Sequence, residues 1–118
     1  MGHLSTHVLD TMHGCPAAGM AVTLLRVDAD GARPVKTVTL DADGRNGGAP
    51  LLDATAIAAG RWRLVFEVGA YFRGRGVALP EPPFLDAVPL DFGIADPALH
   101  YHVPLLATPW SYGTYRGS

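Results

Sequence analysis

Three histidines, one in one segment and two in another, lie in segments that we expect to be β-strands. His7 lies within STHVLD, and His100 and His102 lie within HYHVP. Because side chains alternate across a strand, His7 shares a face with Ser5 and Leu9, and His100 shares a face with His102. An imidazole titrates near neutral pH, so it can take up or give back a proton during a reaction. These histidines are therefore candidates for acid-base chemistry.

Each histidine also has a simpler interpretation, as a surface residue or as a hydrogen-bonded core residue. His100 and His102 could instead bind a transition metal together, since imidazoles on one face of a strand can act as ligands. The sequence shows no cluster that would supply the remaining ligands, and Cys15 stands alone in a predicted turn. We therefore expect neither a metal nor another cofactor.

Arg45 follows a predicted turn over Asp41–Gly44. A loop arginine is ordinarily just solvated. Its planar guanidinium nevertheless presents a fork of hydrogen-bond donors, which suits an anionic or carbonyl-rich heterocycle. Composition alone leaves both interpretations open.

The end of the chain is aromatic and abrupt, with YRGS at residues 115–118 directly after a predicted strand. Chain termini usually fray. An end of this kind indicates that it packs against something, although an edge strand that simply runs out would look the same.

The elements that must position these side chains are short strands separated by turns. Fourteen glycines and ten prolines are scattered along the 118 residues, as expected of an all-β domain. In the clearest strand, Arg61–Val68, alternate residues from Trp62 onward are apolar. Helical signal is limited to one turn over Asp53–Ala59 and one over Ala70–Arg75. The predicted strands cover residues 4–10, 21–27, 35–40, 61–68, 88–94, 100–107 and 110–115, which predicts a β-sandwich.

Composition limits the classes of function. Hydrophobic residues make up 48% of the chain and charged residues 17%, which is enough for one packed domain over residues 1–118. Nine basic and eleven acidic residues without a basic cluster argue against nucleic acid and membrane partners. With one cysteine, no signal-peptide pattern and no long apolar run, we expect a soluble, cytoplasmic protein. Its partners should be small molecules or other protein chains.

Several short motifs occur in order along the chain. LSTHVLDT and GCPA open it at residues 4–11 and 14–17, and DGR follows at residues 43–45. GAYF comes at residues 69–72, and YHVPLL with the final YRGS closes the chain at residues 101–106 and 115–118. As a set they resemble the signatures of the 5-hydroxyisourate hydrolases, the transthyretin-related proteins. The resemblance covers essentially the whole chain and departs from the family mainly at Ala107–Thr108 and Trp110–Ser111, in the last hairpin.

The resemblance implies a transthyretin-like sandwich of two four-stranded sheets, about eight strands, with one short helix near residues 70–75. It also implies a homotetramer, a dimer of dimers, with active sites in the channel between the dimers. The implied reaction is hydrolysis of 5-hydroxyisourate to 2-oxo-4-hydroxy-4-carboxy-5-ureidoimidazoline in urate degradation, without a cofactor. The matching functional positions are His7, Arg45 and His102 as catalytic residues; His7, Arg45, Tyr115 and Ser118 as substrate-binding residues; and Arg116 and Gly117 as supporting residues.

Hydrolysis of a ring amide requires activating a water, stabilising an oxyanion and protonating the leaving nitrogen. His7 and His102 suit the first and third tasks, in either assignment, and Arg45 suits the second. No arrangement of a nucleophilic serine or cysteine is evident, so we expect direct attack by water. The alternative is a transthyretin-like carrier of a hydrophobic hormone, whose channel should be apolar at these three positions. A purely structural β-sandwich would explain none of them.

Overall fold

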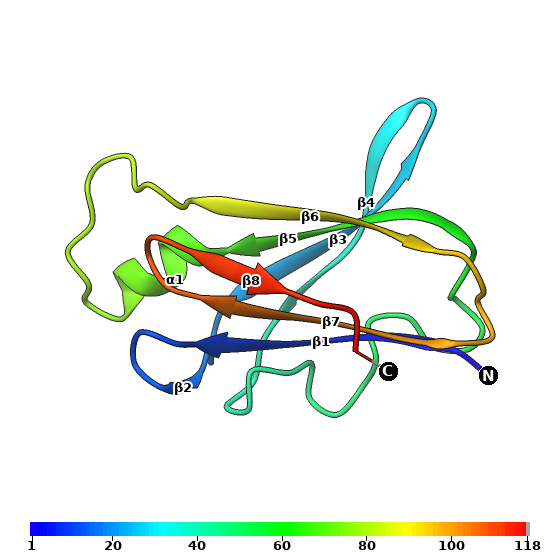
Figure 1. The fold of residues 1–118 in the computed structure, drawn as a ribbon, viewed down its shortest axis with the longest axis horizontal. Coiled ribbons are helices and arrows are strands. Elements are labelled where there is room, and N and C mark those ends of the chain that lie inside the picture. The colour runs from blue at the N-terminus through cyan, green and yellow to red at the C-terminus, as the bar shows by residue number, and fades with distance from the viewer. Residues whose placement is uncertain (118) are drawn as a thin grey trace.

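The computed structural model describes residues 1–117 as two β-sheets packed face to face, with one short helix at one end (Figure 1). The predicted arrangement of two four-stranded sheets with one short helix is confirmed. The elements are β1 (His3–Asp10), β2 (Cys15–Pro16), β3 (Ala21–Asp28), β4 (Gly31–Thr39), β5 (Gly60–Glu67), α1 (Val68–Gly74), β6 (Ala87–Ile94), β7 (His100–Ala107) and β8 (Tyr112–Thr114).

The first sheet has the order β2-β1-β7-β8 and carries the predicted histidines. Its central strands β1 and β7 are parallel, with His3 opposite His100 and Ser5 opposite His102. Opposed residues of a parallel pair point to the same side, so these four and His7 share one face. Along β1 half-buried and buried residues alternate strictly, and the histidine face is the half-buried one. It is therefore the outer face of the sandwich.

The second sheet has the order β4-β3-β5-β6 and supplies the other wall of the core. The apolar face predicted for residues 61–68 is confirmed, because Trp62, Leu64, Phe66 and Val68 are all 5% exposed or less. At roughly 1.5–3 kcal/mol for each large apolar side chain buried, this face contributes strongly to the stability of the sandwich.

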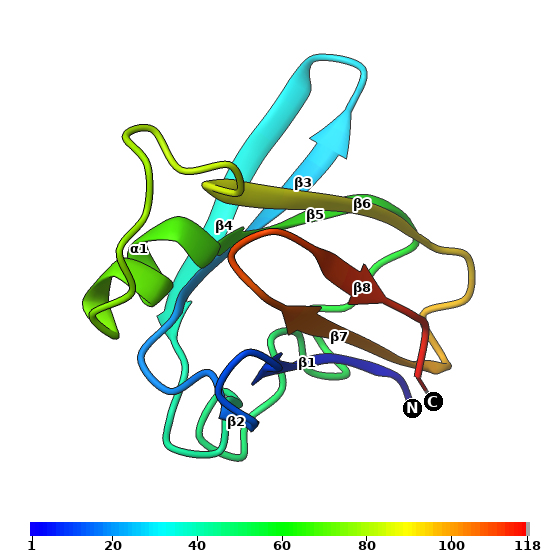
Figure 2. The ribbon, with the colours of Figure 1, turned by 60° about the vertical axis from the view of Figure 1, so that its left-hand side comes forward.

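Two elements of the sheets differ from the prediction. β4 begins at Gly31, four residues before the predicted start at Val35, because β3 and β4 pair as far as Asp28 opposite Gly31. This hairpin projects beyond the sandwich (Figure 2), and residues 31–34 are exposed, so burial imposes no apolar alternation on them. Cys15–Pro16, predicted as part of a turn, is the short strand β2, which pairs with the end of β1.

The helical segments and the last hairpin also differ in their bounds. α1 begins at Val68, two residues before the predicted helix, and so takes in the last residue of the predicted strand 61–68. The predicted turn at residues 53–59 is a single turn closed by the N–H of Ile57 on the carbonyl oxygen of Asp53, 2.9 Å away. The last loop covers residues 108–111, because the hydroxyl of Thr108 accepts the N–H groups of Trp110 and Ser111. Within residues 1–117, no helix is long and apolar enough to cross a membrane.

Candidate functional site

A cleft of about 280 Å³ opens on the outer face of the first sheet. One wall is β1, represented by His3 and Ser5, and the other is the loop after β4, with Arg45, Asn46 and residues 48–50. His7 follows Ser5 on the same face of β1, and His102 lies beside Ser5 on β7. The structure therefore brings the two predicted histidines and the loop arginine to one face.

His102 is held by Ser5 at its ring and by the end of the chain at its backbone. The hydroxyl of Ser5 lies 2.8 Å from Nδ1 of His102. On the other side the chain end pairs with β7: the N–H of Gly117 donates to the carbonyl oxygen of His102 at 2.7 Å. A Cβ atom on Gly117 would lie 2.9 Å from Cδ2 of His102, so glycine lets the end of the chain lie against the imidazole.

The loop that carries Arg45 is organised by the carboxylate of Asp41. Its Oδ1 accepts the N–H groups of Asp43 and Arg45 at 2.8 and 3.0 Å, and its Oδ2 accepts that of Gly47 at 3.0 Å. The hydrogen bond from the Arg45 backbone is the main reason why the pKa of Asp41 lies below its usual value. The loop is thus fixed by one side chain at its start.

Gly44 joins this loop to β1. Its φ is +71°, in the left-handed region that favours glycine, and its carbonyl oxygen accepts the N–H of Val8 at 3.0 Å. A Cβ atom there would lie only 2.5 Å from the carbonyl oxygen of Val8. Because Arg45 follows directly, this close approach places the exposed guanidinium next to the face that carries His7.

The electrostatics of the site favour the neutral form of both imidazoles. Burial, and then the positive charge of Arg45, lowers the pKa of His7, against opposing effects of the Asp43 backbone and of nearby carboxylates. Burial, and then Arg45 and the neighbouring histidines, lowers the pKa of His102. A neutral imidazole can accept a proton, which is what a general base must do.

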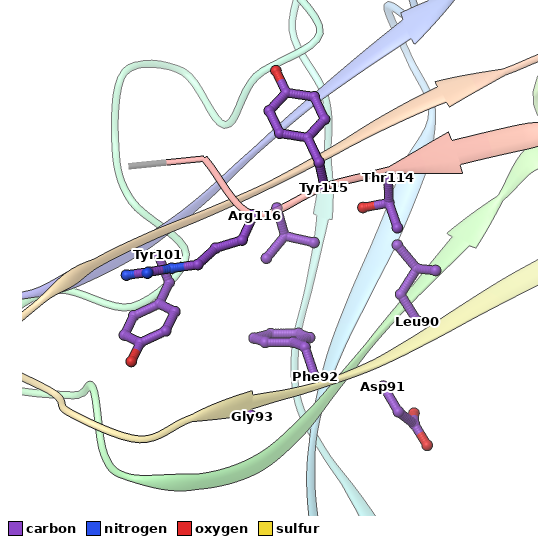
Figure 3. Close-up of a pocket in the computed structure, with 9 residues that line it drawn as sticks. Leu90, Asp91, Phe92, Gly93, Tyr101, Thr114, Tyr115 and Arg116 are labelled. Atoms are coloured by element: carbon purple, nitrogen blue, oxygen red, sulfur yellow. The ribbon is translucent and has the colours of Figure 1, made fainter.

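Tyr115 and Arg116 line a different cavity, of about 250 Å³, between β6 and β8 at the edges of the two sheets (Figure 3). The guanidinium of Arg116 stacks over the ring of Tyr101 at 4.4 Å and donates to the carbonyl oxygen of His100 at 3.0 Å. Arg116 thereby fixes the end of the chain against β7, next to Gly117.

Tyr115 is 61% exposed, and its ring points away from Phe92 in the apolar part of this second cavity (Figure 3). Within one chain the structure therefore leaves Tyr115 and Arg116 apart from the cleft that Arg45 lines, and neither His7 nor His102 lines that cleft. The predicted substrate-binding residue Ser118 lies outside the described residues. Gly117 is the part of the closing motif that reaches His102.

Three residues with a part in this geometry were not predicted from the sequence: Ser5, Asp41 and Gly44. The only signals were that Ser5 shares a strand face with His7 and that Asp41 opens a turn. Among residues 1–117, no group of three or more His, Cys, Asp or Glu side chains could hold a metal ion. His100 stacks on His3 instead, with the ring centroids 4.1 Å apart.

Comparison with known proteins gives consistent matches over the whole chain. The model of the HIUase/transthyretin family matches residues 4–117. The chain is 54% identical to a 5-hydroxyisourate hydrolase of Ralstonia nicotianae, over the full length of both. It also superposes on a crystal structure of (S)-allantoin synthase with a TM-score of 0.91 and 44% identity, covering 99% of this chain and 44% of that one.

A sea bream transthyretin in complex with thyroxine superposes with a TM-score of 0.84 and 28% identity, covering 97% of this chain and 93% of that one. The predicted transthyretin-like fold is confirmed.

Proposed function

This chain belongs to the HIUase/transthyretin family and hydrolyses 5-hydroxyisourate in urate degradation, and we propose that His7, Arg45 and His102 carry out the hydrolysis. The observation that carries the proposal is that the fold brings these three residues, which are far apart in sequence, to the outer face of the first sheet. Burial there, and then the charge of Arg45, lowers the pKa of both histidines. A hydrophobic carrier channel would not need this charged and polar group.

In the proposed mechanism, one neutral imidazole takes a proton from water as the water oxygen bonds to a ring carbonyl carbon. Arg45 stabilises the negative charge that develops on the carbonyl oxygen. When the tetrahedral intermediate collapses, the ring C–N bond breaks and the proton is returned to the leaving nitrogen, directly or through the second imidazole. Water, proton and bond changes then balance without a covalent enzyme intermediate or a cofactor.

We propose that the active protein is a homotetramer, a dimer of dimers, in which another subunit covers the histidine face. In support, this face lies on the outside of the sandwich, and the cleft is open along it. Tyr115 and Ser118 would complete the substrate site in the assembled channel, with Arg116 and Gly117 supporting the end of the chain.

We further propose that the chain acts as one domain in the cytoplasm. Both sheets contribute to one hydrophobic core, which supports a single domain. The thiol of Cys15 is free, which suits a reducing compartment.

The test is to generate 5-hydroxyisourate in situ from urate and to follow its ultraviolet decay with and without the protein. His102→Ala and Arg45→Ala should each lower turnover on the order of 100-fold or more, since each removes a group that acts in the transition state. Arg33→Ala is the matched control, because Arg33 is exposed on the projecting β3–β4 hairpin.

Sedimentation should show the same assembly for all three variants and for the wild type. Near-normal turnover in His102→Ala or Arg45→Ala would show that its assigned role is wrong.

A further inference from the structure

Ser5 makes the only side-chain hydrogen bond to His102 among the described residues. Its Oγ lies 2.8 Å from Nδ1, and both residues are half-buried. They are also opposed residues of the parallel β1–β7 pair, so the contact joins two adjacent strands at the centre of the first sheet. A hydrogen bond between neighbouring strands holds a side chain more firmly than one from a loop.

The rest of the contacts limit how the His102 ring can sit. Gly117 lies so close to the His102 ring that a Cβ atom on Gly117 would come within 2.9 Å of Cδ2 of His102. A half-turn of the ring would exchange Nδ1 for Cδ2 and place a C–H group against the Ser5 hydroxyl, which loses the hydrogen bond. In the observed orientation Nδ1 is occupied, and Nε2 has no hydrogen-bond partner within residues 1–117.

We propose that Ser5 is a positioning residue for the hydrolysis: it holds His102 by Nδ1, so that Nε2 is the atom that exchanges a proton with water or substrate. This inference rests on the proposed function of His102. A serine hydroxyl both donates and accepts, so the contact can persist whether or not Nδ1 carries the proton. His102 can therefore change its protonation state during turnover without losing its orientation.

The choice of serine, rather than a carboxylate, also fits the charges that face His102. Burial opposes a positive charge on its ring most strongly, and Arg45 on the loop and His7 and His3 on β1 oppose it as well. A carboxylate at position 5 would favour the imidazolium. The uncharged hydroxyl orients the ring and leaves it neutral, ready to accept a proton.

The experiment compares Ser5→Ala with Thr11→Val, each of which removes one hydroxyl that links β1 and its extension to β7. The hydroxyl of Thr11 donates to the carbonyl oxygen of Ala107 at 3.2 Å, at the far end of the pair from His102. Ser5→Ala should lower kcat about tenfold with little change in KM, as expected for one lost positioning hydrogen bond. Ser5→Thr should restore most of kcat, and Thr11→Val should leave it unchanged.

The second measurement is independent of activity. In ¹⁵N NMR spectra, the two ring nitrogens of His102 should differ from those of a free imidazole in the wild type and shift toward them in Ser5→Ala. If Ser5→Ala behaved like Thr11→Val in kcat, or left the His102 nitrogen shifts unchanged, the inference would be overturned while the role of His102 stood. If His102→Ala itself kept full turnover, the proposed function would fail first.

Discussion

Gly44 is where the addition of one methyl group should displace the arginine loop. A Cβ atom there would lie 2.5 Å from the carbonyl oxygen of Val8, 3.2 Å from Cβ of Pro16 and 3.3 Å from the backbone nitrogen of Ala17. The first contact is with backbone in β1, which is paired on both sides with β2 and β7. The loop must therefore move away from the strand, and Arg45 must move with it.

The size of the effect follows from two contributions. A non-glycine residue in the left-handed region costs about 1 kcal/mol, and loss of the hydrogen bond from the N–H of Val8 costs about another 1 kcal/mol. We expect Gly44→Ala to lower the free energy of unfolding by about 2 kcal/mol. Gly47→Ala is the matched control: its φ is +61°, but a Cβ there meets nothing within 4 Å, so only the first cost of about 1 kcal/mol applies.

Urea unfolding at one fixed protein concentration measures the stability of both variants. Decay of 5-hydroxyisourate measures their turnover, which should fall on the order of 100-fold in Gly44→Ala, because misplacement by about 1 Å has effects of this size. Gly47→Ala should keep near-normal turnover. Equal losses of stability and of turnover in the two variants would refute the view that contact between Gly44 and Val8 places Arg45.

Three further predictions concern titrating groups. Because burial and Arg45 lower the pKa values of His7 and His102, both rings should titrate below 6.5 by NMR, and Arg45→Met should raise both values; unchanged titration in that variant would contradict the assigned electrostatics. In the wild type, kcat/KM should then hold as the pH falls to these lowered values and decline below them, since a protonated imidazole is no base. Burial alone would raise the pKa of Asp10, but hydrogen bonds from His13 and from the hydroxyl of Tyr71 lower it below 3.8. The stabilising effect of the Asp10 carboxylate is therefore present above pH 3.8 and is lost as the pH falls through the folded-state pKa. Asp10→Asn should lower the free energy of unfolding by about 2 kcal/mol in urea at pH 7 and by progressively less below pH 3.8. A cost independent of pH would exclude the carboxylate charge as its source.

The strands that could be predicted are those with one face in the core. In β5 the large apolar side chains recur at every second position, and in β1 the alternation separates His7 from Val8. Burial on one side imposes this period on the sequence. The first residues of β4, 31–34, escape it because they are exposed on a projecting hairpin, and β2 is too short, at two residues, to show any period.

The residues of the candidate site could be predicted from sequence motifs, but the contacts between them could not be predicted. His7 and His102 were assigned to strand faces correctly, yet nothing local shows that β1 pairs in parallel with β7 or in which register. The contact between Ser5 and His102 depends on that register. Likewise, the position of Arg45 depends on a left-handed residue and a close backbone approach at Gly44, which follow from the tertiary structure and not from the turn sequence alone.

The same strands show why one fold can support either hydrolysis or binding. The core-facing residues of β1, Leu4, Thr6 and Val8, are 3% exposed or less. Stability therefore depends mainly on one face of the strand, and the residues of the other face can change without emptying the core. An outer face with apolar residues would suit a hydrophobic ligand between subunits. With His7 and His102 on that face and Arg45 held against it, the same surface would instead supply the base, the acid and the oxyanion-stabilising group of the proposed mechanism.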